Sequence, residues 1–318
     1  MTSIEWTEQT WNPIAGCSVL SPGCKRCYAM KMARRLELMG SAVYAGLTQQ
    51  TAAGPVWTGK IEVNENTMLA PLKRKKPTMY FVNSMSDLFH ESVPDEVIDR
   101  VFAVMALCPQ HTFQVLTKRS ARMRHYFSGM SWGWRVMEAK KALDPSHRSG
   151  MGGILETKNG SLPNVWLGVS VEDQKRADER IPDLLNTPAA IRFLSCEPLL
   201  GPVDLNRIHE EFDGGLGHSW ESCLNGKRFS PWAGDDEDPM IPGHPKIDWV
   251  IVGGESGPGA RPMANDWAQA IVDQCQAASV PVFVKQLSSG GPKPIKDIEQ
   301  FPEGLRVRQW PVVEERKG

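Results

Sequence analysis

Short apolar runs, bounded by polar or glycine residues, recur along the chain. Runs without alternation of apolar and polar residues are typical of strands that are buried on both faces of a parallel sheet. Residues 94–107 begin with a proline and repeat apolar positions at helical spacing, and residues 174–185 directly follow a run, so both are predicted helices. The predicted strands are residues 79–83, 112–116, 165–170, 191–195, 249–253 and 280–285.

The alternation of strands and helices predicts an α/β fold. With a further strand before Cys17, the runs suit a full or partial (β/α) barrel, which we favour, although a doubly wound open sheet gives much the same pattern. We expect a single domain over residues 1–318, with insertions near 127–162 and 206–246. Connections of that length usually are functional loops, small inserted subdomains or flexible segments.

The overall charge adds little to this picture, because 36 Lys and Arg residues face 37 Asp and Glu residues, a formal net charge of −1. No field of the whole chain therefore attracts nucleic acid or acidic lipid, and any such contact must be local. The sequence shows no apolar segment of signal-peptide type and no uncharged apolar run long enough to span a bilayer. We expect a cytoplasmic protein without a membrane partner.

The cysteines carry the strongest chemical signal. Three of the seven, Cys17, Cys24 and Cys27, have the spacing C-x6-C-x2-C, and the other four are scattered. In a reducing compartment, clustered thiols are more often metal ligands or redox groups than disulfides. Three thiolates on a four-iron, four-sulfur (4Fe-4S) cluster leave one iron open, and an open iron can chelate the amino and carboxylate groups of S-adenosylmethionine.

Two other interpretations of the cysteines remain. A structural zinc site needs four ligands, and no cysteine or histidine in the sixty residues after Cys27 completes one locally, although a remote ligand is an alternative. A thioredoxin-like redox pair also uses C-x-x-C, but it leaves Cys17 without a role and expects a different fold context. The 4Fe-4S cluster is the interpretation that we favour.

The residues that follow the predicted strands are unusually polar. Active sites of (β/α) barrels gather at the carboxyl ends of the strands, so these residues predict one shared pocket, although any one of them alone is an ordinary loop residue. Glu197, Lys118 and Lys285 are the candidates for catalysis or for contact with a substrate carboxylate or phosphate. The candidates for cofactor binding are Asn83, Ser84, Asp87, Ser170, Glu172, Gly253, Gly254 and Glu255.

Two basic stretches, residues 73–76 and 118–125, offer local contacts to nucleic-acid phosphates. Charge runs are usually solvated surface, and we interpret residues 73–76 in that way. The second stretch is the better candidate because it begins at the end of a predicted strand.

Cys17, Cys24, Cys27 and Tyr28, followed by alternating strands and helices, resemble the radical S-adenosylmethionine superfamily. The usual spacing there is C-x3-C-x2-C with an aromatic residue before the last cysteine, whereas here the first gap is six and Arg26 holds the aromatic position. More closely, the chain resembles a phage-associated three-cysteine-motif family that is described as radical-SAM-like. The matching blocks are WNP at 11–13, NSMSDLF at 83–89, LTKR at 116–119, LGVS at 167–170, SCEPLL at 195–200, GGESG at 253–257 and KQ at 285–286.

The resemblance implies a radical S-adenosylmethionine enzyme, located in the host cytoplasm if phage-encoded, that acts on a nucleotide or DNA base. Phage thymidine hypermodification and an isomerase-type rearrangement are the analogies that fit, and the chemistry needs an external electron donor. One alternative is a zinc- or cluster-stabilised nucleic-acid-binding protein without turnover. Another is an iron-sulfur accessory protein that works with a partner enzyme.

Overall fold

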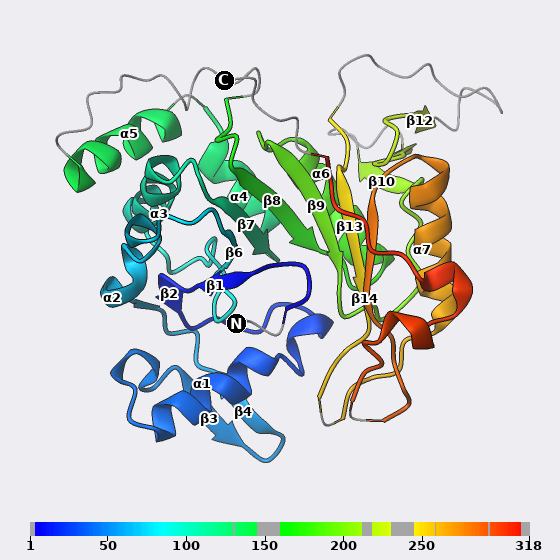
Figure 1. Cartoon of the computed structure of the whole chain (residues 1–318), viewed down its shortest axis with the longest axis horizontal. Coiled ribbons are helices and arrows are strands. Elements are labelled where there is room, and N and C mark those ends of the chain that lie inside the picture. The colour runs from blue at the N-terminus through cyan, green and yellow to red at the C-terminus, as the bar shows by residue number, and fades with distance from the viewer. Residues whose placement is uncertain are drawn as a thin grey trace. The chain divides into compact units, whose positions relative to one another are not determined.

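The computed structural model describes residues 4–129, 131–144, 160–211, 218–229, 245–257, 259–291 and 293–312 (Figure 1). The chain forms two compact units. The first comprises Met1–Val169 and Thr187–Ala190, and the second comprises Ser170–Asn186 and Ile191–Gly318. No helix in the described ranges is both long and apolar enough to cross a membrane.

The sheet strands of the first unit are parallel and follow the order β1, β6, β7, β8. Their side chains are mostly buried, which explains why each strand after β1 was visible in the sequence as an apolar run. Their bounds are Gln9–Trp11 for β1, Met79–Val82 for β6, Thr112–Thr117 for β7 and Val165–Ser170 for β8.

Helices α3 (Asp95–Leu107), α4 (Ser120–Phe127) and α5 (Ser131–Leu143) complete this unit together with the short α2 (Glu65–Met68). Helix α5 lies in the predicted insertion 127–162 and packs on α3. Asp99 of α3 links the three helices, because its carboxylate accepts hydrogen bonds from Tyr126 Oη of α4 at 2.6 Å and from Arg135 Nε of α5 at 3.1 Å. Residues 145–159 of the insertion lie outside the described ranges.

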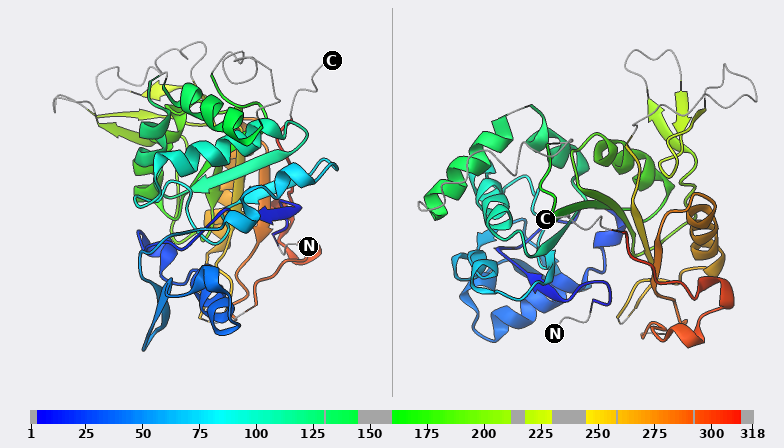
Figure 2. Two further views of the ribbon diagram at one scale, coloured as in Figure 1. Left: turned by 90° about the vertical axis from the view of Figure 1, so that its left-hand side faces the viewer. Right: turned by 45° about the horizontal axis from the view of Figure 1, so that its top comes forward.

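A small substructure that the sequence patterns did not predict surrounds the cysteine segment. Figure 2 shows α1 (Tyr28–Leu38) beside the hairpin of β3 (Thr48–Thr51) and β4 (Gly54–Trp57). A second, antiparallel pair joins β2 (Ile14–Ala15) to β5 (Glu62–Val63). Their shared core consists of Ala15, Ala29, Met30, Ala33, Tyr44, Leu47, Trp57 and Met85.

In the second unit, β9 (Ile191–Cys196), β13 (Trp249–Gly253) and β14 (Val282–Gln286) are parallel, with β13 in the middle. Helix α6 (Gln174–Leu185) has the bounds that the sequence predicted, and α7 (Asn265–Ala277) packs on β13 and β14 (Figure 1). The α/β fold with parallel strands is therefore confirmed.

The predicted insertion 206–246 contains an antiparallel sheet of β10 (Ile208–Glu211), β11 (His218–Glu221) and β12 (Arg228–Phe229). Residues 212–217 and 230–244 lie outside the described ranges. Single 3-10 turns occur at Pro22–Cys24, Ala42–Tyr44, Pro71–Lys73, Ile298–Gln300 and Glu303–Leu305.

Candidate metal centre and polar strand ends

Three loops of the first unit meet after the carboxyl ends of β1, β6 and β7. Gly16 joins the first two, because its N–H donates to Met85 O at 3.2 Å and it bridges to Ser86. Gly16 has a φ of +94°, and a Cβ atom there would lie 2.2 Å from Lys60 O, so only glycine fits. This close approach fixes where Cys17 begins the cysteine loop.

The cysteine loop is short and internally hydrogen-bonded. The 3-10 turn Pro22–Cys24 follows Ser21, whose O accepts from Cys24 N at 2.9 Å, and Cys27 N donates to Cys24 O at 3.2 Å. Cys27 is the N-cap of α1, and a helix N-terminus favours an anion such as a thiolate. Cys17 and Cys27 both pack against the core of the small substructure, and Cys24 is buried.

Burial and nearby charges act in opposite directions on these thiols. Burial raises the pKa of Cys17 to about 12, and Asp87 adds to this, whereas the Arg119 guanidinium lowers it. The pKa of Cys27 is also raised by burial, while hydrogen bonds from the α1 backbone and the charge of Lys118 lower it. The metal-free protein therefore holds Cys17 and Cys27 as thiols at neutral pH, and a metal must displace their protons to bind.

Arg119, two residues after β7, contacts side chains of all three loops. Its Nη1 lies 3.1 Å from Asp87 Oδ2 and 3.7 Å from Cys17 Sγ, and its Nε donates to both carboxylate oxygens of Glu91. Asp87 also accepts from Thr117 Oγ1 at 2.7 Å and from Lys118 N at 3.0 Å. The predicted cofactor ligand Asp87 is therefore part of a buried ion pair that places a cation beside Cys17.

Ser18 receives two hydrogen bonds in the same network. Arg119 Nη2 donates to Ser18 Oγ at 2.7 Å, and His90 Nε2 lies 3.0 Å from the same oxygen. Because His90 Nδ1 accepts from Ser92 N at 3.1 Å, the neutral ring carries its proton on Nε2 and donates it to Ser18. Burial lowers the pKa of His90, and the Arg119 charge lowers it further, which favours this neutral form.

Asn83, at the end of β6, has an unusual environment. The residue is 4% exposed and adopts a φ of +59°. Neither Nδ2 nor Oδ1 of its amide has a hydrogen-bond partner among the described residues. Buried polar groups are nearly always paired, and an unpaired one costs about 1–3 kcal/mol. A donor and an acceptor are thus available to a ligand. The neighbouring Ser84 hydroxyl is instead bound to Asn12 Oδ1 at 3.0 Å.

The grouping of the three thiols bears on which metal group they could hold. In the described part of the chain, no three His, Cys, Asp or Glu side chains are grouped closely enough to hold one metal ion. Ligands of one zinc ion have sulfur atoms about 4 Å apart, because each lies about 2.3 Å from the metal. A cluster binds each cysteine through a different iron and so accepts a wider spacing. Arg119 lies close to Cys17, and the charge of Lys118 acts on Cys27.

In the second unit, Glu197 and Lys285 form a close pair. Lys285 Nζ lies 2.5 Å from Glu197 Oε1, and Gln286 Nε2 lies 3.4 Å from the same oxygen. Glu197 follows β9 and the other two residues end β14, so the pair sits at the carboxyl ends of parallel strands. Gly253, at the end of β13, leaves space there, because a Cβ atom would lie 3.5 Å from the Glu197 carboxyl carbon. The structure brings two of the three catalytic candidates into contact.

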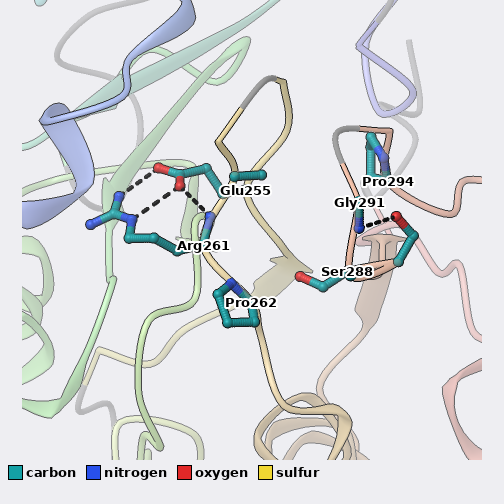
Figure 3. Close-up of a pocket in the computed structure, with 9 residues that line it drawn as sticks. Glu255, Arg261, Pro262, Ser288, Gly291 and Pro294 are labelled. Atoms are coloured by element: carbon teal, nitrogen blue, oxygen red, sulfur yellow. Dashed lines mark hydrogen bonds and ion pairs between the residues drawn. The ribbon is translucent and has the colours of Figure 1, made fainter. Parts of the chain in front are cut away.

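Glu255 lines a small pocket of about 130 Å³ after β13 (Figure 3). Its carboxylate accepts from Arg261 Nη2 at 2.5 Å, from Arg261 Nε at 3.0 Å and from Arg261 N at 2.8 Å. Ser288, Gly291 and Pro294 line the opposite wall, as Figure 3 shows. Sites for drug-sized ligands measure about 300–1,000 Å³, so this pocket accepts only part of such a molecule.

Two other cofactor candidates belong to a fully buried contact. Glu172 Oε2 lies 2.7 Å from Arg180 Nη1, which also donates to Ser170 O at 2.8 Å. The pair fastens α6 to the end of β8, and this contact accounts for the burial of Glu172 without a ligand. Gly254 is similarly enclosed, because a Cβ atom there would lie 2.9 Å from Ser288 Oγ.

The sequence patterns missed several polar residues of these networks. Ser18, Glu91, Arg180 and Arg261 are bound to predicted site residues or to Arg119, and the His90 ring is bound to Ser18. Their one shared signal is position, since each lies within about ten residues of a predicted site residue. That signal is too weak to single them out from ordinary loop and helix residues.

Comparison with known proteins places the chain in a family but does not assign an activity. The sequence matches no curated protein and no solved structure. Residues 1–307 match a family that is described as "Protein of unknown function (DUF5131)". This match covers nearly the whole chain, and it includes the cysteine loop and every strand-end residue discussed above. The chain therefore belongs to the DUF5131 family.

Proposed function

We propose that this protein is a radical S-adenosylmethionine enzyme that binds a 4Fe-4S cluster through Cys17, Cys24 and Cys27. The observation that carries the proposal is the cysteine loop itself: three thiols in eleven residues, after a parallel strand, with Arg119 3.7 Å from Cys17 Sγ. A partial (β/α) barrel of the radical S-adenosylmethionine type is the finer architecture that we propose for the parallel strands.

Residues around the loop would compensate the negative charge of three thiolates. Arg119 and Lys118 supply two positive charges, and the α1 N-terminus adds its partial positive charge at Cys27. Hydrogen bonds to cluster sulfurs raise reduction potentials in proteins, and Arg119 Nη1 is a donor to Cys17. Arg119 would also hold the start of the cysteine loop in place through its hydrogen bond to Ser18.

The chemistry that such a cluster supplies when bound is transfer of one electron to S-adenosylmethionine, whose carbon–sulfur bond breaks to give methionine and a 5′-deoxyadenosyl radical. The unpaired amide of Asn83 offers a donor and an acceptor to the amino-acid or adenine part of this cofactor. Gly253, Gly254 and Glu255 are the further candidates for cofactor contact. The Lys285–Glu197 pair offers a donor and an acceptor at the strand ends, where they can contact a polar group of the substrate.

A nucleotide or DNA base, as in phage thymidine hypermodification, is the substrate class that we propose, by analogy with the phage-associated family that the chain resembles. Lys118 and the basic residues that follow it support this choice, since phosphates bind such side chains. The second candidate is a cluster-binding accessory or nucleic-acid-binding protein without turnover. It is favoured if the loaded protein does not cleave S-adenosylmethionine.

The test begins with anaerobic purification and reconstitution with iron and sulfide. We expect brown protein that forms 5′-deoxyadenosine from S-adenosylmethionine when dithionite is added. Cys24→Ala should lose both the cluster and the product, whereas Cys108→Ala, which removes a buried thiol outside the loop, should keep both. A bound cluster without product would favour the accessory role, and tightly bound zinc in place of iron would refute the proposal.

A further inference from the structure

The outer face of the cysteine loop and of α1 exposes an unusual number of apolar side chains. Val19 and Leu20 lie between Cys17 and Cys24, and Tyr28 and Met32 lie four residues apart on α1. These four side chains are between 39% and 51% exposed. Residues four apart on a helix share one face, so Tyr28 and Met32 give α1 an exposed apolar stripe that begins directly after Cys27. We call these four residues the apolar centre.

Positive charges without neutralising partners lie among the residues of the apolar centre along the chain. Lys25, Arg26, Lys31 and Arg35 are all exposed, and none has a carboxylate partner in the described part of the chain. The one acidic residue of α1, Glu37, is bound to Arg34 at 2.8 Å. The exposed residues of the loop and of α1 are therefore mainly apolar and basic, although the whole chain has a net charge of −1.

We propose that this surface docks an acidic protein that carries single electrons at low potential. The inference rests on the proposed function, because each cleavage of S-adenosylmethionine consumes one electron, which an outside donor must supply. The carrier loses one electron and the metal centre gains it, with no bond made or broken between the two proteins. Lys25 and Arg26 lie between Cys24 and Cys27 in the sequence, so a partner bound there is next to two of the three ligands.

The composition of the surface fits this partner. Electron-transfer complexes are small and transient, and opposite charges around an apolar middle steer and orient them. Single-stranded nucleic acid would instead need aromatic rings on which bases can stack. The apolar centre has one aromatic ring, Tyr28, whose hydroxyl donates to Ser84 O at 2.8 Å, and its other members are aliphatic. The basic charge and the mainly aliphatic side chains therefore favour an acidic protein over a nucleic acid.

The experiment uses reduced plant-type [2Fe-2S] ferredoxin, an acidic carrier with a potential of about −400 mV, as the probe. Reoxidation of ferredoxin by the reconstituted full-length protein with S-adenosylmethionine is followed by stopped flow. Lys31→Glu/Arg35→Glu reverses two charges on α1, away from the cysteines. Lys75→Glu/Lys76→Glu makes the same change in net charge at exposed residues elsewhere in the first unit.

We expect the α1 double variant to lower the second-order rate about tenfold at low ionic strength, and the difference to shrink at high salt. The Lys75/Lys76 control should stay within about twofold of the unchanged protein. Equal effects of the two double variants would overturn the docking proposal. So would an unchanged ferredoxin rate combined with weaker binding of a DNA duplex, which would assign the surface to nucleic acid.

The dithionite reaction separates this inference from the proposed function. Dithionite is a small reductant that needs no docking surface. If dithionite gives no 5′-deoxyadenosine in the unchanged protein, the proposed function fails, and this inference fails with it. If dithionite gives product in the unchanged protein and the α1 variant slows ferredoxin no more than the control does, only the docking surface is refuted.

Discussion

Replacement of Arg119 by methionine tests whether this residue holds the candidate site together. The Arg119 side chain is 3% exposed and contacts Asp87, Glu91 and Ser18. Methionine keeps an unbranched apolar side chain but removes every donor. The change therefore leaves the Asp87 carboxylate, which is 7% exposed, without its cation.

The expected cost follows from these contacts. Breaking a buried ion pair by removing one partner costs about 3–5 kcal/mol, because a buried charge is left uncompensated. Asp87 keeps hydrogen bonds from Phe89 N, Thr117 Oγ1 and Lys118 N, which places the cost near the lower end, at about 3 kcal/mol. The contact with Glu91 adds less than about 1 kcal/mol, since that side chain is 61% exposed.

The assay is urea unfolding of the metal-free protein under reducing conditions, for Arg119→Met, Asp87→Asn and the double variant. We expect the double variant to lose about 2 kcal/mol less than the sum of the single changes, because the two side chains interact directly. Arg122→Met removes one of the two cations near the half-exposed Asp95; it is the control and should cost less than about 1 kcal/mol. A cost below 1 kcal/mol for Arg119→Met, or additivity within about 0.5 kcal/mol, would refute the reasoning.

Three further predictions concern stability of the metal-free protein, each measured by urea unfolding. Burial raises the pKa of Cys108 to about 12, so the stabilising contribution of its thiol is complete below pH 9 and falls as the pH rises toward 12. Relative to Cys108→Ala, the unchanged protein should therefore lose about 1.4 kcal/mol of unfolding free energy per pH unit above 9. Parallel pH profiles of the two proteins would contradict this. Asn83→Gly should raise stability by about 1 kcal/mol, because it removes two unpaired polar groups and glycine adopts a positive φ freely. A loss of more than about 1 kcal/mol would mean that the Asn83 amide has hydrogen-bond partners in the folded protein. Gly16→Ala should cost about 3 kcal/mol or more, because the Cβ of the alanine would meet Lys60 O. Gly46→Ala, which has open space around it, should cost about 1 kcal/mol. Equal costs would show that the close approach at Gly16 is absent.

The sequence predicted the parallel strands well because their signal is local. Residues 249–253 and 165–170 coincide with β13 and β8, and both are continuous buried runs. The start of β14 was predicted two residues early, at 280 in place of Val282. Pro281 explains this difference, because proline has no N–H to donate to a neighbouring strand and so tends to precede a strand.

Contacts between distant residues could not be predicted in the same way. The sequence offered Lys118 and Asp87 as separate candidates, but the pairing of Asp87 with Arg119 depends on how two loops fold toward each other. Glu172 shows the opposite case. The sequence offered this polar residue at a strand end as a ligand of a cofactor, but its carboxylate is bound to Arg180 of the next helix. A polar residue at a strand end is a candidate for ligand binding, but only the tertiary structure shows whether another residue of the protein already binds it.

The six-residue gap between Cys17 and Cys24 has a structural explanation. The usual radical S-adenosylmethionine spacing has three residues there, and a longer loop needs additional support if its cysteines are to stay in position. Ser18 supplies that support, because it accepts hydrogen bonds from Arg119 and His90, which belong to two other loops. The Pro22–Cys24 turn then shortens the path to Cys24, and Val19 and Leu20 between them remain exposed. The added residues thus both anchor the loop and form part of the surface to which we assign the electron carrier.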